Sequence, residues 1–151
     1  MGFPGGAGFP DVTFVTSGTV YDAAIAADLE RELGIRLGSE VMPFAEFTRR
    51  LDQDPPAMWQ LGWAADFPHP HDFLGLLLET GSANNVGGWS DAAFDEALDA
   101  AASTADPAEQ TARYEEAQGI VADQVPVIPL EYPEDWALSR DGLLGAGDAG
   151  L

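Results

Sequence analysis

The sequence predicts an α/β fold in which helices flank a mixed, mostly parallel sheet. The first observation is that apolar runs of strand length alternate with amphipathic helical patterns, as in parallel sheets with right-handed crossovers. The second is that 46% of the 151 residues are hydrophobic and 10% are aromatic, so the chain can bury a core. This length is close to the most common domain size, which predicts a single domain over residues 1–151.

Three strands and two helices are predicted in the first part of the chain. The strands cover residues 11–17, 36–42 and 57–64, and the helices cover residues 20–33 and 43–53. Thr19 is a suitable N-cap for the first helix, and Gly34 can end that helix in the left-handed conformation. Pro43 can open the second helix, and Asp54 with the two prolines after it ends that helix.

The rest of the chain is predicted to be mainly helical. The elements are helices over residues 73–78, 90–102 and 106–124, a loop over 81–88, an extended edge segment over 125–132 and a last strand around 136–139. Ser90 and Asp106 are the predicted N-caps, and Pro107 suits the first helical position. The inward faces of the last two helices comprise Phe94, Ala97, Leu98, Tyr114, Ala117, Ile120 and Val121.

Charge and composition exclude several classes of partner and chemistry. The chain has 26 acidic residues against 6 arginines and no lysine, a formal net charge of −20. Such a surface repels phosphate backbones and anionic headgroups, so we expect no nucleic-acid binding and no binding to a membrane surface. No apolar run approaches the ~18 residues of a membrane span, so we expect no direct membrane insertion. The absence of cysteine removes thiol nucleophiles and Cys-zinc sites.

Both histidines lie in the stretch GWAADFPHPHDF at residues 62–73. A His-x-His pair binds metals when it lies on a strand, but the flanking prolines favour polyproline II, where residues two apart point about 120° from each other. We therefore expect exposed loop histidines, with no metal, no cofactor and no catalytic residue. The alternative from another class is a metal-dependent hydrolase. It would use Asp66, His69, His71 and Asp72.

Trp63 and Asp66 lie at the carboxyl end of the third predicted strand. Ligands of open α/β sheets bind at that edge, and a tryptophan face beside a carboxylate suits an ammonium group or an organic cation. A core tryptophan and a capping aspartate would produce the same pattern. The residues by themselves leave both interpretations open.

Four segments in order resemble a known family. They are AGFP, GWAADFP-x-P-x-DF, SANNVGGWSDAAFDEAL and VADQVPVIPLEY. Together they resemble the C-terminal lobe of family 5 extracellular solute-binding proteins of ABC transporters, the class that binds dipeptides, oligopeptides and nickel. The resemblance implies a Rossmann-like lobe of a type II periplasmic-binding-protein fold. It also implies a non-enzymatic protein, extracellular or periplasmic, that delivers a peptide or small-molecule ligand to an ABC permease.

The resemblance also assigns candidate ligand-binding residues. Asp66 matches the aspartate that pairs with a peptide's α-ammonium, and Trp63 and the backbone of Ala64 match residues that line the pocket. Asn84 and Asn85 match a loop near the cleft.

Two departures from the family pattern bear on the ligand and on the extent of the chain. The family more often has an acidic residue and an asparagine where this chain has His69 and Asp72, which leaves the ligand preference open. Because the family is broad, a different cationic or neutral ligand, such as an oligosaccharide or a metal chelate, is an alternative. Family proteins are also several times longer. We therefore expect this chain to be one lobe of a longer two-lobed protein, from which the first lobe, the export signal and the lipid-attachment cysteine are absent, and the lobe could lack activity of its own.

Overall fold

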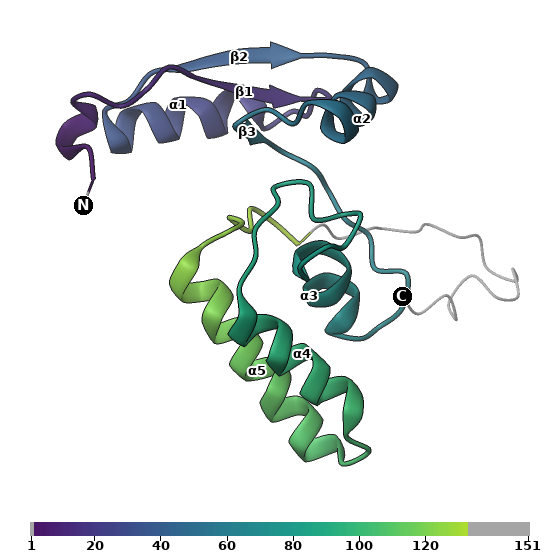
Figure 1. The fold of residues 1–151 in the computed structure, drawn as a ribbon. Coiled ribbons are helices and arrows are strands. Elements are labelled where there is room, and N and C mark those ends of the chain that lie inside the picture. The colour runs from purple at the N-terminus through teal and green to yellow at the C-terminus, as the bar shows by residue number, and fades with distance from the viewer. Residues whose placement is uncertain (1, 133–151) are drawn as a thin grey trace, which may run out of the picture. The chain divides into compact units, whose positions relative to one another are not determined.

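The computed structural model describes residues 2–132 and divides the chain into two compact units (Figure 1). Unit 1 comprises Met1–Ala64 and unit 2 comprises Ala65–Leu151. The single domain over residues 1–151 stays a prediction.

Unit 1 is a three-stranded parallel sheet with its connecting helices (Figure 1). Its elements are the short 3-10 helix η1 (Pro4–Gly6), β1 (Val12–Thr16), α1 (Asp22–Leu33), β2 (Leu37–Val41), α2 (Phe44–Gln53) and β3 (Met58–Trp59). The strand order is β2-β1-β3, and Phe14 of the central strand pairs with Ser39 on one side and Met58 on the other. The predicted parallel sheet is confirmed, but the third strand has two residues where residues 57–64 were predicted.

A buried hydrogen-bond network sets the start of α1. The Asp22 carboxylate accepts from the hydroxyls of Thr16 and Thr19, and from the Thr19 N–H at 2.9 Å. Thr19 is therefore not the N-cap as predicted, because its side chain is turned towards the first helical residue, Asp22. The helix α1 begins two residues later than the predicted start at residue 20. Burial raises the pKa of Asp22, but these hydrogen bonds outweigh it, so the pKa lies below the ordinary value of 3.8.

Unit 2 is helical within its described residues and consists of α3 (His71–Leu78), α4 (Ala92–Ser103) and α5 (Pro107–Gln124). α4 and α5 pack side by side (Figure 1). All the predicted inward residues of these two helices are buried or partly buried in one cluster, which also contains Leu74 and Leu78 of α3. The predicted cap at Asp106 is confirmed, since its carboxylate accepts from the Ala108 N–H at 2.9 Å.

Two predictions in unit 2 are wrong. Asp91, not Ser90, caps α4, because its carboxylate accepts from the Phe94 N–H at 2.9 Å, whereas the Ser90 hydroxyl accepts from the Thr80 hydroxyl. Residues 125–132 form no strand: Val125 ends α5 in the left-handed conformation (φ 50°), and the two prolines after it have no N–H to donate to a ladder. The strand predicted at 136–139 lies outside the described residues.

Across residues 2–132, none of the helices is long and apolar enough to cross a membrane.

Candidate functional site

The segment Asp66–His71, called the histidine loop below, leads directly into α3 in unit 2. The backbone turns through hydrogen bonds from the His69 N–H to the Phe67 carbonyl (2.8 Å) and from the Asp72 N–H to the His69 carbonyl (3.0 Å). The Asp72 carboxylate accepts from the Asp66 N–H at 3.2 Å. Asp72 is fully buried whereas Asp66 is exposed, so the loop holds an exposed carboxylate on a fixed backbone.

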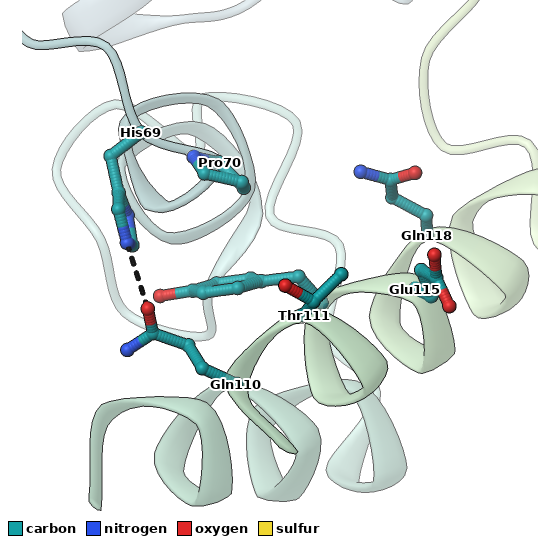
Figure 2. A pocket seen from close by; sticks show the side chains of 7 residues that line it. His69, Pro70, Gln110, Thr111, Glu115 and Gln118 are labelled. Carbon is teal, nitrogen blue, oxygen red and sulfur yellow. Dashed lines mark hydrogen bonds between the residues drawn. The ribbon is translucent and has the colours of Figure 1, made fainter. Parts of the chain in front are cut away.

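His69 ties the histidine loop to α5. Its Nδ1 accepts from the His71 N–H at 3.2 Å, which places the ring proton on Nε2, 3.4 Å from the Gln110 side-chain oxygen (Figure 2). The ring also makes an edge-to-face contact with Tyr114, at 5.2 Å between centroids. The expectation of an exposed histidine is therefore wrong for His69, which is half-buried and holds the loop in place.

His71 is also half-buried and packs within its own helix. Its ring occupies the space that a Cβ on Gly75, one turn later, would need, and it lies 6.4 Å from the ring of Tyr114. Burial raises the pKa of Tyr114. The expectation of an exposed loop residue is thus wrong for His71 too, because the missing side chain of Gly75 lets the ring lie against the helix.

The four residues of the hydrolase alternative do not form a metal centre. Within residues 2–132, no three His, Asp or Glu side chains gather where they could hold a metal ion. His69 Nδ1 and the Asp72 carboxylate instead accept hydrogen bonds from backbone N–H groups of the same loop. These side chains shape the histidine loop.

A depression of about 370 Å³ lies where the histidine loop meets α5 (Figure 2). It is lined by His69, Pro70, Gln110, Thr111, Tyr114, Glu115 and Gln118. These groups offer amide and hydroxyl hydrogen bonds and one carboxylate, which suit a small polar or cationic group. Sequence reasoning missed this surface, because the polar residues of α5 have the pattern of an ordinary solvated helix face.

The two asparagines of the predicted site differ in their surroundings. The Asn85 amide nitrogen donates to the carbonyl oxygens of Leu78, Glu79 and Trp89 at 3.1, 3.2 and 2.7 Å, so it closes the loop between α3 and α4. Asn84 is exposed, and its backbone N–H lies 3.4 Å from the Ser82 hydroxyl. Of the two side chains, that of Asn84 is presented to solvent.

The predicted site residues are distributed over both units. Trp63 is half-buried and Ala64 is exposed at the end of unit 1, whereas Asp66, Asn84 and Asn85 belong to unit 2. Their roles in ligand binding stay predictions.

Known proteins similar to this chain are named as peptide-binding proteins. Di/tripeptide-binding protein 4 of Pseudomonas aeruginosa is 33% identical over 137 residues, which are 86% of this chain and 26% of that protein. The oligopeptide-binding protein OppA of Bacillus subtilis is 24% identical over 116 residues, which are 77% of this chain and 21% of that protein. The chain thus spans about a quarter of the length of these relatives. No family model matches the chain.

A solved structure shows the same relation in three dimensions. The ABC transporter-associated periplasmic binding protein DppA of Helicobacter pylori, in complex with the peptide STSA, superposes with a TM-score of 0.75 and is 29% identical. The match covers 84% of this chain and 27% of DppA. The predicted fold class is thereby confirmed.

Proposed function

Because the chain belongs with the dipeptide- and oligopeptide-binding proteins of the extracellular solute-binding class and spans about a quarter of their length, we propose that it supplies one wall of a peptide-binding cleft. The relatives are substrate-binding proteins rather than enzymes. In this proposal the protein works outside the cytoplasmic membrane, in the periplasm or at the cell surface. It delivers its ligand to an ABC permease.

The observation that carries the proposal is the exposed carboxylate of Asp66 on a backbone fixed by Asp72. A peptide has an ammonium group at its N-terminus whatever its sequence, so a fixed carboxylate recognises peptides as a class. By the family resemblance, Trp63 and the backbone of Ala64 are further candidate contacts for the ligand, and in unit 2 the exposed Asn84 would offer an amide to the peptide backbone. The Asn85 amide nitrogen already donates within its loop, so Asn85 would act by shaping the loop that carries Asn84.

The test is calorimetric titration of the complete gene product with unmodified peptides of two to about five residues. We expect saturable binding that falls sharply when the peptide's amino group is acetylated. Failure of all such peptides to bind, or equal binding of acetylated peptides, would contradict the proposal.

A further inference from the structure

We propose that Asp72 is a positioning residue, which holds the backbone of Asp66 so that the exposed Asp66 carboxylate meets the ammonium group of the ligand. This inference rests on the proposed function. It assigns a specific task to a buried acidic side chain that does not face the ligand.

Asp66 and Asp72 are in direct contact. The Asp72 carboxylate accepts from the Asp66 N–H at 3.2 Å, and this bond closes residues 66–72 into a ring of seven residues. A carboxylate acceptor makes a stronger hydrogen bond than a neutral carbonyl or amide. Asp72 also lies in the first turn of α3, where the helix dipole favours a negative charge.

Asp72 is itself firmly held. It has no exposed surface, and α3 packs into the core of unit 2 through Leu74 and Leu78. A side chain on a packed helix is held in place by the core, so it also restrains the group to which it is hydrogen-bonded. Asp66 therefore has a rigid backbone although its own side chain is in solvent.

The rest of the histidine loop has little conformational freedom. Pro68 and Pro70 fix two of its backbone φ angles, and His69 connects it to Gln110 of α5. A loop fixed at both ends and at its centre loses little conformational entropy when a ligand binds, which raises affinity without any further contact. The negative charge of Asp72, held at the Asp66 N–H, adds to the attraction for a cation.

The experiment compares two peptides on three variants of the complete gene product. The peptides are an unmodified tripeptide and the same tripeptide acetylated at its amino group. D72L removes the acceptor but keeps a branched side chain, D72N keeps an oxygen acceptor at nearly the same volume without the charge, and D99N removes one exposed charge from α4 as a control.

We expect D72L to weaken binding of the unmodified peptide about tenfold and D72N about threefold, with the acetylated peptide unchanged in both. D99N should leave both affinities as they are. In the same proteins, exchange of the Asp66 amide hydrogen should be at least tenfold faster in D72L than in the wild type, because its acceptor is gone.

A general structural role would lower the affinity for both peptides equally, and that result would overturn the inference. So would an unchanged preference for the unmodified peptide in D72L or, if D72L does not fold, in D72N. A wild type with no preference between the peptides would instead show that the proposed function is wrong, and the inference would fall with it.

Discussion

Replacing Asn85 by Asp should destabilise unit 2 much more than the same replacement at Asn84. Each of the two changes adds one negative charge to the same loop and conserves the shape of the side chain, and the two positions are adjacent. The Asn85 amide nitrogen, however, lies 2.7 Å from the Trp89 carbonyl oxygen and within 3.2 Å of two others, whereas Asn84 is exposed. A carboxylate at position 85 would turn these donor contacts into contacts between oxygens.

The magnitude follows from these contacts. An amide group has two N–H bonds, so Asn85 makes at most two full hydrogen bonds, each contributing ~0.5–1.5 kcal/mol net. Their loss and the added repulsion should lower the free energy of unfolding by about 2–3 kcal/mol in N85D, against at most ~0.5 kcal/mol for the surface change N84D. For a unit of this size the melting temperature should fall on the order of 10 °C in N85D.

The assay is thermal and urea unfolding of the 151-residue chain, followed by far-UV circular dichroism. N85D should unfold at a lower urea concentration than N84D, with the same slope, because stability and not compactness has changed. Equal stabilities of N84D and N85D would refute the assignment of Asn85 as the residue that closes the loop.

Three further predictions concern backbone contact, pH and salt. Gly5 and Gly6 both have positive φ, but only at Gly6 would a Cβ overlap the Gly34 carbonyl group at the end of α1. Urea unfolding should therefore show that G6A lowers the free energy of unfolding by about 2 kcal/mol more than G5A does. Equal losses would contradict the close contact. The pKa of Asp22 is depressed in the folded state, so the stabilisation by its carboxylate is present above pH 3.8 and is lost as pH falls through the folded-state pKa. D22N should therefore remove this part of the dependence of the unfolding free energy on pH. An unchanged dependence would contradict the hydrogen-bond network of Asp22. With a net charge of −20, the melting temperature should rise between low and molar sodium chloride, and a flat curve would show that the acids do not repel each other appreciably.

Local sequence signals predicted the helices of unit 2 well. The period of apolar residues places Phe94 and Tyr114 in the core, and Asp106 caps α5 as expected. Where two residues are equally good caps, local preference cannot decide: Asp91 caps α4 because Ser90 is engaged by Thr80, ten residues before it. The first two strands were predicted to within one residue at each end, but the third was predicted too long, because an apolar run such as residues 57–64 pairs only as far as a neighbouring strand extends alongside it.

The candidate site could be predicted from sequence only in part. A local motif and its family resemblance point to Asp66, but the residues that fix its loop act over distances that no local pattern records. Gln110 meets His69 across 41 positions, and nothing in the polar face of α5 distinguishes it beforehand. Asp72 was predicted as part of a possible metal site, whereas its hydrogen bond to the Asp66 N–H depends on the turn between them.

The most direct measurement of the central claim is a calorimetric double-mutant cycle between D66N and acetylation of the peptide's amino group, in the complete gene product. Removing one partner of a desolvated charge pair costs on the order of 2–5 kcal/mol, so D66N should weaken binding of the unmodified peptide at least ~30-fold. The acetylated peptide should bind weakly to the wild type and lose little more in D66N, because the interaction is already absent. Independent, additive losses would show that Asp66 does not contact the ammonium group and would contradict the account.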